Sequence, residues 1–111
     1  MENYKDSLNN ANENMMKLAQ LIPNEMNSFM SLHDAALENG ALDPKAKELI
    51  ALGIGIAIRC ETCILSHLNS LIKLGVTKKE IQETIAVAIF MGGGPSVGYG
   101  SKTLAAFEQL S

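Results

Sequence analysis

Apolar residues recur at helical spacing along nearly the whole chain of 111 residues. A first stripe steps by four and three residues over positions 4–22 and stops at Pro23. A second stripe covers positions 26–37 and is followed by the turn residues Asn39-Gly40. Steps of three and four place side chains on one face of a helix, whereas a strand would need strict alternation. The pattern therefore predicts two amphipathic helices at the start of the chain and indicates no convincing strand anywhere in it.

Capping residues and glycines set the limits of four further predicted helices. Asp43 followed by Pro44 is typical of an N-cap with a proline at the first helical position. Thr77 and Glu80 have the spacing of a capping box, and Gly75 is typical of a left-handed C-terminal cap. These signals predict a third helix from Pro44 that is apolar on all sides over Leu49–Ile58, a fourth over Cys63–Leu74, a fifth from the capping box to Met91, and a sixth over Pro95–Leu110, after the glycine run 92–94.

The pattern indicates one all-α domain of about six helices over residues 1–111. No internal repeat, low-complexity segment or long linker divides the chain. The third and fifth helices are apolar around nearly their whole circumference, over 49–58 and 85–91. A six-helix monomer of this size can bury one such helix at its centre, but two are hard to cover. We therefore expect a homo-oligomer in which a subunit interface supplies the missing cover.

Composition and charge exclude several classes of function. Hydrophobic residues make up 47% of the chain and charged residues 19%, which is typical of a folded domain. The net charge of −3 and the absence of a Lys/Arg cluster argue against binding to nucleic acid or to an anionic membrane surface. The longest apolar run, Leu49–Ile58, has about half the length that a bilayer span needs. The first residues lack the basic and apolar order of a secretory signal, so we expect a cytoplasmic protein.

One group of residues carries candidate chemistry. Cys60, Cys63 and His67 are spaced three and then four residues apart, so a helical turn would place them on one stripe. The pair lies near the start of the fourth predicted helix, where free N–H groups favour a thiolate. His67 can take or return the proton of the sulfur one turn before it. These features predict a reversible dithiol in which Cys63 is activated by His67.

Two other interpretations of the cysteines stay open. They can be inert buried thiols, since free cysteine is among the most buried residue types. They can also bind zinc together with His67 and either Glu48 or His33, although structural zinc sites usually draw ligands from two separate loops. A c-type haem is excluded because Ile64, and not a histidine, follows the second cysteine. A thioredoxin-type motif needs a βαβ setting, which is absent.

Glu48 and His33 are the remaining candidates. Glu48 is either a carboxylate at the edge of a dry pocket or a solvated first-turn residue beside Lys45 or Lys47. In a straight helical hairpin Glu48 and His67 are offset by about 6 Å along the axis, so contact between them is not assured. His33 falls on the apolar stripe of the second helix and is predicted to be a histidine at the edge of the core.

These residues carry a resemblance to a known family. The segment from Glu48 through Cys60, Cys63 and His67 to Gly75 resembles the core of the alkylhydroperoxidase D-like, carboxymuconolactone decarboxylase family. Glu80, Ile81 and the turn 91–95 are similar to the next helix and turn of that family. The resemblance covers a family-like core of about residues 42–107.

The resemblance implies a fold, an assembly and an activity. Family members are all-helical and assemble as trimers or hexamers, and we expect no cofactor for this chain. By their pattern Cys63 attacks a hydroperoxide and becomes a sulfenic acid, Cys60 donates a proton and resolves it as a disulfide, and Glu48 with His67 relays protons. A dithiol reductant, for example a dihydrolipoyl protein domain, then restores the thiols. Thr62 stands where the best-known peroxidases have a histidine, and the chain has one helical repeat where they have two, so the rate and the reductant are not implied.

Two alternative functions belong to other classes. A cofactor-free decarboxylase or lyase would use Glu48 and His67 with the thiols as bystanders. The decarboxylase branch of the family lacks the dithiol, however, so Cys60 and Cys63 argue against lactone decarboxylation. A non-enzymatic oligomer that senses oxidants through the same dithiol is the other alternative.

Overall fold

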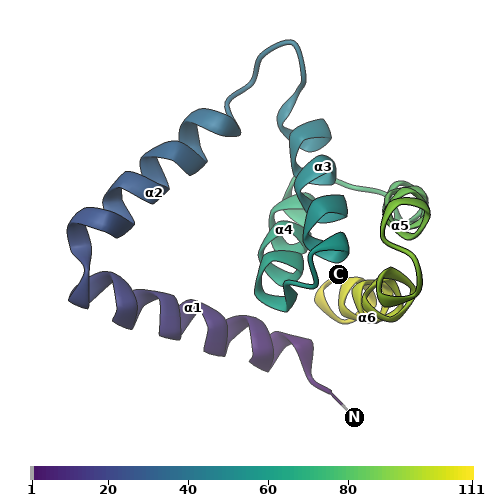
Figure 1. Cartoon of the computed structure of the whole chain (residues 1–111), viewed down its shortest axis with the longest axis horizontal. Helices are drawn as coiled ribbons and strands as arrows, with labels where there is room; N and C mark the ends of the chain where they lie inside the picture. The colour runs from purple at the N-terminus through teal and green to yellow at the C-terminus, as the bar shows by residue number, and fades with distance from the viewer. Residues whose placement is uncertain (1) are drawn as a thin grey trace.

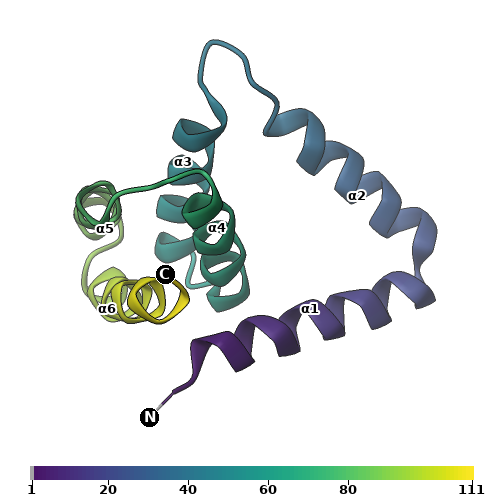
Figure 2. The same cartoon turned by 180° about the vertical axis from the view of Figure 1, so that it is seen from behind.

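The computed structural model describes residues 2–111, and within that range it contains six helices and no strand (Figures 1 and 2). The prediction of an all-α fold with about six helices is therefore confirmed. The helix that was expected to begin at Cys63 begins two residues earlier, because Cys60 is its N-cap. The helices are α1 (Tyr4–Leu21), α2 (Pro23–Ala36), α3 (Pro44–Ala57), α4 (Glu61–Lys73), α5 (Lys78–Gly92) and α6 (Gly94–Leu110).

The predicted caps form as the sequence indicates. The Asp43 side chain accepts a hydrogen bond from the Ala46 N–H at 2.7 Å, which caps α3. The Thr77 hydroxyl accepts from the Glu80 N–H while the Glu80 carboxylate accepts from the Thr77 N–H, which completes the capping box of α5. Gly75 has a φ of +77° at the end of α4. Each cap satisfies backbone groups that a helix end leaves free, so these local signals fix the helix ends.

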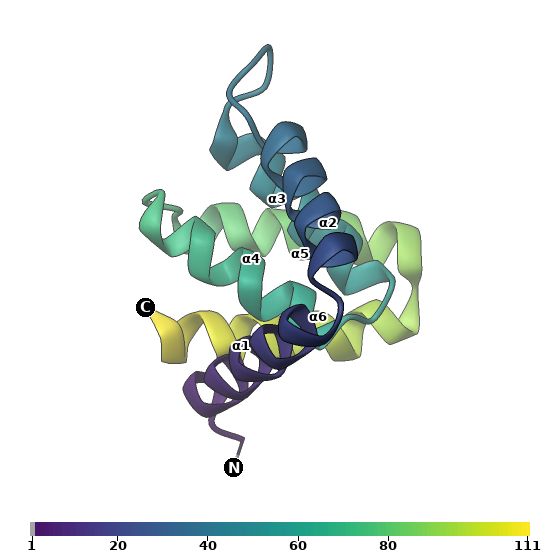
Figure 3. The ribbon, with the colours of Figure 1, turned by 90° about the vertical axis from the view of Figure 1, so that its left-hand side faces the viewer.

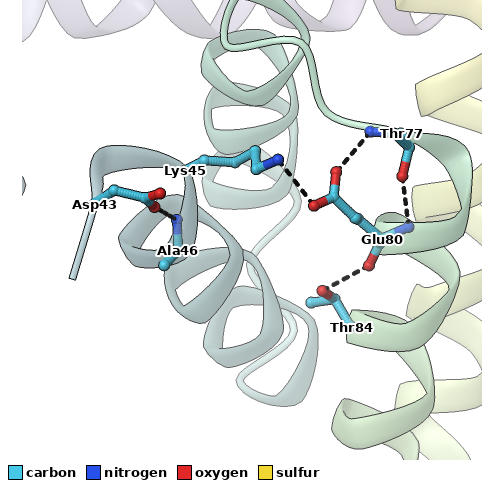
Figure 4. Close-up of polar contacts among 6 residues, drawn as sticks. All are labelled: Asp43, Lys45, Ala46, Thr77, Glu80 and Thr84. Carbon is cyan, nitrogen blue, oxygen red and sulfur yellow. Dashed lines mark hydrogen bonds and ion pairs between the residues drawn. The ribbon is translucent and has the colours of Figure 1, made fainter.

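The starts of α3 and α5 are also joined directly to each other. Lys45 of α3 forms an ion pair of 2.9 Å with Glu80 of α5 (Figure 4). The hydrogen bond from the Thr77 backbone, and then the charge and hydrogen bond of Lys45, lower the pKa of Glu80 below its usual value. The carboxylate is therefore charged at neutral pH and holds the two helix starts together.

The core lies among α3, α4, α5 and α6. The third helix contacts each of the other three, and its buried side chains point to the centre of this group. The largest fully buried apolar side chains come from α3, α4 and α5: Leu52, Ile56, Leu65, Leu68, Leu71 and Ile81. This arrangement brings the C-terminal half of α3 against α4, where the cysteines lie.

The first two helices are attached less closely. The start of α1 packs on α4 and α6 through the buried side chains of Tyr4 and Leu8 (Figure 3). In contrast, α2 packs only against α1 and contains no buried residue. It stands apart from α3–α6 in two opposite views (Figures 1 and 2). The radius of gyration is accordingly 14.1 Å, against about 13 Å for a compact domain of this length.

Large apolar side chains remain exposed on α3 and α5. Ile54 of α3 is 55% exposed, and Phe90 of α5 is 84% exposed. This exposure supports the premise that one chain cannot cover both helices, and the homo-oligomer itself stays a prediction. Among the described residues, no helix combines the length and the apolarity that crossing a membrane requires.

Two glycines of α6 provide a matched test of the packing between α5 and α6. A Cβ on Gly100 would lie 2.7 Å from Cγ2 of Ile85, whereas a Cβ on Gly98 would meet nothing within 4 Å. Replacing either glycine with alanine gains about 1 kcal/mol of helix propensity. We expect Gly98→Ala to stabilise the protein, and Gly100→Ala to be less stable than Gly98→Ala by about 1–3 kcal/mol because of the overpacking. Urea unfolding measures the difference, and equal stabilisation by both substitutions would contradict the observed packing.

Candidate active site

The two cysteines lie at the start of α4. They form a disulfide in this structure, with Cα atoms 5.2 Å apart. Cys60 is the N-cap residue and has extended backbone angles, so it is not part of the helix. Its sulfur accepts a hydrogen bond of 3.2 Å from the Cys63 N–H. Cys63 and His67 therefore lie on one stripe of α4 as expected. Cys60 is not on that stripe, but as the N-cap residue it lies next to Cys63.

A tight turn places Cys60 directly after α3. The Cys60 N–H donates to the carbonyl of Gly55, and the Arg59 N–H donates to the carbonyl of Ile56. This pair of bonds is a Schellman motif, in which the residue at the left-handed position is usually glycine. Here that residue is Arg59, with a φ of +61°. A non-glycine residue in this conformation costs about 1 kcal/mol or more, so the turn that positions the dithiol is strained.

Gly55 lets α3 approach the dithiol closely. The residue is buried, and a Cβ added to it would lie 3.4 Å from Cβ of Cys63. A Cβ here would be in van der Waals contact with Cys63, so a side chain that extends beyond Cβ would push α3 away from the start of α4. The close approach brings the buried face of α3, including Glu48, alongside α4.

Glu48 and His67 are in direct contact. The Glu48 carboxylate oxygen Oε2 lies 2.6 Å from Nδ1 of His67, across 19 residues of sequence. Glu48 is only 6% exposed, and the His67 side chain is 20% exposed. Glu48 is therefore a buried carboxylate and not a solvated first-turn residue. Because the carboxylate holds Nδ1, the ring is fixed in orientation and Nε2 is the nitrogen left to exchange protons.

The start of α1 and the start of α4 contribute one residue each, Tyr4 and Glu61, that the sequence patterns did not single out as a pair. Burial first, then the hydrogen bond and the charge of Glu2, and last the charge of Glu61, raise the pKa of Tyr4 to about 12. Glu61 is only partly exposed, and its oxygen Oε1 is buried without a hydrogen-bond partner. Tyr4 of α1 thus lies in the field of a carboxylate that directly follows Cys60. No local signal could have found this pair, because 57 residues separate its members.

The structure does not bring His33 to this site. His33 lies on α2, its side chain is 40% exposed, and its Nδ1 is 3.0 Å from the carboxylate of Asp34. The prediction of a core-edge histidine was wrong, because α2 packs only against α1. Within residues 2–111 no three His, Cys, Asp or Glu side chains gather as metal ligands. The site therefore consists of the Cys60–Cys63 pair at the start of α4 and a buried pair, Glu48 of α3 and His67 of α4.

Sequence and structure comparisons give consistent matches. The sequence model of the carboxymuconolactone decarboxylase family matches residues 23–106. The structure of a carboxymuconolactone decarboxylase family protein from Legionella pneumophila is similar with a TM-score of 0.93 and 40% identity, over 97% of this chain and 96% of that one. A Thermotoga maritima protein of the same family, described with a possible part in the antioxidative response, gives a TM-score of 0.73 and 30% identity over 78% of this chain and 89% of that one.

Curated relatives agree with these matches. An uncharacterized protein from Cupriavidus necator is 35% identical over 107 residues, which are 96% of this chain and 95% of that protein. Alkyl hydroperoxide reductase AhpD from Coxiella burnetii is 37% identical over 57 residues, which are 51% of this chain and 32% of the reductase. The match to the reductase therefore spans about a third of that protein's length.

Proposed function

Because the chain belongs to the carboxymuconolactone decarboxylase family, and because it carries a dithiol beside a buried Glu–His pair, we propose that it is a thiol-dependent peroxidase. The substrate class is small hydroperoxides, and the catalytic residues are Cys63, Cys60, His67 and Glu48. One observation carries the proposal. The Cys60–Cys63 pair lies at the start of α4, and His67, held at 2.6 Å by Glu48, lies one helical turn after Cys63.

The first step is the attack of Cys63 on the peroxide. The Cys63 thiolate attacks the terminal peroxide oxygen and breaks the O–O bond, so that the sulfur is oxidised to a sulfenic acid and the peroxide is reduced to an alcohol. The leaving alkoxide needs one proton. A position in the first turn of α4 favours the thiolate, since the helix dipole stabilises negative charge there.

Glu48 and His67 supply and collect the protons. The imidazole takes the Cys63 proton before the attack and returns it to the alkoxide afterwards. The Glu48 carboxylate, buried against Nδ1, holds the ring orientation and stabilises the imidazolium that forms between these events. The pair thus has the geometry of an oriented general acid and base.

Cys60 completes the cycle. Its sulfur attacks the sulfenic acid on Cys63 and its thiol proton passes to the leaving hydroxyl, so that the disulfide forms and water is released. The Cys63 N–H, which lies 3.2 Å from the Cys60 sulfur in the disulfide form, would stabilise charge on that sulfur. A dithiol reductant, for example a dihydrolipoyl protein, then takes up the oxidising equivalents and restores both thiols. A reducing compartment such as the cytoplasm suits this cycle, and we propose the trimeric or hexameric assembly that family members adopt.

A free-thiol titration tests the proposal. We expect one equivalent of hydroperoxide to remove two thiols per chain, and excess small dithiol to restore both. Continued consumption of peroxide while the dithiol is present distinguishes an enzyme from a redox sensor, whose thiols would oxidise once without turnover. Thiols that stay reduced after an equivalent of peroxide would contradict the proposed chemistry.

A cofactor-free lyase is a second candidate. The observation that favours it is that the Glu48–His67 pair forms an acid–base unit which needs no thiol. Such an activity would survive alkylation of Cys60 and Cys63, whereas the peroxidase activity would not. Alkylated protein assayed with both substrate classes therefore separates the two functions.

A further inference from the structure

One apolar surface that the chain leaves uncovered is α2, which we call the arm helix. None of its residues is buried, and it packs only against α1. Phe29 is 59% exposed, and Met30 and Leu32 are also exposed. A helix with an uncovered apolar stripe is rarely stable by itself in water, because most helical stability in proteins comes from packing.

The other uncovered surface is a groove between α3 and α5, which we call the α3–α5 groove. It has a volume of about 510 Å³ and is open to solvent along α5, where Val87 is 64% exposed. Its wall is almost entirely apolar. The residues that matter here are Ile50, Gly53 and Ile54 of α3 and Val87, Ala88 and Met91 of α5.

We propose that the arm helix of one copy docks into the α3–α5 groove of a second copy of the same chain. The arm has the spacing that helix-in-groove recognition uses, since the apolar side chains of Met26, Phe29 and Met30 stand at positions i, i+3 and i+4. Gly53 lines the groove and has no side chain, so the backbone of a docked helix can approach α3 closely at this position. This inference goes beyond the proposed function, because it concerns the contact between subunits and not the chemistry of the thiols.

The same chain cannot place its own arm in its own groove without losing other contacts. Tyr4 and Leu8 fix the start of α1 on α4 and α6, and only Ile22 separates α1 from α2. The direction of α1 therefore carries the arm away from α3 and α5 (Figures 1 and 2). A neighbouring copy presents the same groove without this restraint.

The chain exposes more surface than a compact monomer of its mass, which is the result expected if a partner normally covers part of it. The accessible surface is 6950 Å², whereas a compact monomer of this mass exposes about 6,000 Å². The excess of about 1,000 Å² is close to the ~800 Å² that each partner buries in a stable interface. An exchange of arms, either reciprocal between two copies or cyclic around a ring, would remove this excess and close the assembly.

Sedimentation of charged variants tests the contact. Wild-type protein at micromolar concentration should sediment as a multiple of 11.9 kDa. We expect Phe29→Lys, on the arm, and Val87→Glu, in the groove, each to reduce the mass to that of the monomer. Both side chains are largely exposed, so the helical circular dichroism should be unchanged. Leu74→Lys is the matched control, because Leu74 is an exposed apolar residue outside both surfaces, and it should assemble like the wild type.

Mixing the two variants shows which surfaces meet. In a mixture, the unaltered arm of the Val87→Glu chain can enter the unaltered groove of the Phe29→Lys chain, and the altered arm and groove carry opposite charges. The mixture should therefore assemble although neither variant does so alone. A monomeric wild type, assembly of either variant alone, or a mixture that stays monomeric would each overturn the proposal. None of these measurements reads peroxidase activity, so a failure of the docking proposal leaves the proposed thiol chemistry standing, and a failed thiol titration leaves the docking proposal standing.

Discussion

Replacing Cys63 with serine should abolish peroxide consumption, whereas replacing Cys60 should stop the cycle one step later. The serine hydroxyl of the first variant is not ionised at neutral pH, so the nucleophile of the first step is lost. The Cys60→Ser variant still attacks the peroxide but cannot form the disulfide. It should therefore consume one equivalent of peroxide per chain and accumulate a sulfenic acid on Cys63, which dimedone labels and mass spectrometry locates.

The pair of variants assigns the roles of the two sulfurs. Steady-state consumption of peroxide should fall to the background rate in both variants. The two are therefore distinguished by the initial burst of peroxide consumption and by which cysteine dimedone labels. A burst and a label on Cys60 in the Cys63→Ser variant would reverse the assignment, and full turnover in either variant would exclude the dithiol cycle. The reduced wild type is the reference for folding, since both variants lack the disulfide.

Helix limits could be predicted from the sequence because their causes are local. The Asp43 cap, the Thr77–Glu80 box and the left-handed Gly75 each involve residues three or fewer positions apart or a single backbone angle. The dithiol at a helix start was predictable for the same reason. The left-handed backbone conformation of Arg59 could not be predicted, because it follows from the turn between α3 and α4 and not from the preference of arginine itself.

Contacts between helices needed information that periodicity does not contain. An offset of about 6 Å along a straight hairpin left contact between Glu48 and His67 undecided. In the structure, Glu48 lies nine residues before the end of α3, and His67 lies six residues after the start of α4. The offset is then about 4.5 Å, and the two side chains span it with a contact of 2.6 Å between Oε2 and Nδ1.

The wrong prediction for His33 has a related cause. Periodicity finds the apolar face of a helix but does not say what covers it. The face of α2 was assigned to the core of its own chain, and the structure leaves it exposed. The same limit applies to the fifth helix, where excess apolar surface correctly indicated missing cover on α5 but not which segment would supply it.

Replacing Glu48 with glutamine should slow peroxide reduction by about 10²-fold or more, which is the usual loss when a general acid–base unit is impaired. Glutamine keeps the size of the side chain and can still accept a hydrogen bond from Nδ1 of His67. It removes the negative charge that stabilises the imidazolium during proton transfer. Stopped-flow measurement of sulfenic acid formation, made in the Cys60→Ser background, reads this step without the later ones.

Glu80→Gln is the matched control for the loss of a carboxylate. Glu80 also forms an ion pair that joins α3 to another helix, but its partner is Lys45 at the far end of α3 from the cysteines. We expect Glu80→Gln to keep the wild-type rate of sulfenic acid formation. Thermal unfolding separates catalysis from structure, since weakening a buried hydrogen bond also destabilises a protein. If Glu48→Gln lowered the unfolding temperature but left the rate and its pH profile unchanged, Glu48 would serve only to hold α3 against α4, and His67 would have to exchange protons without it.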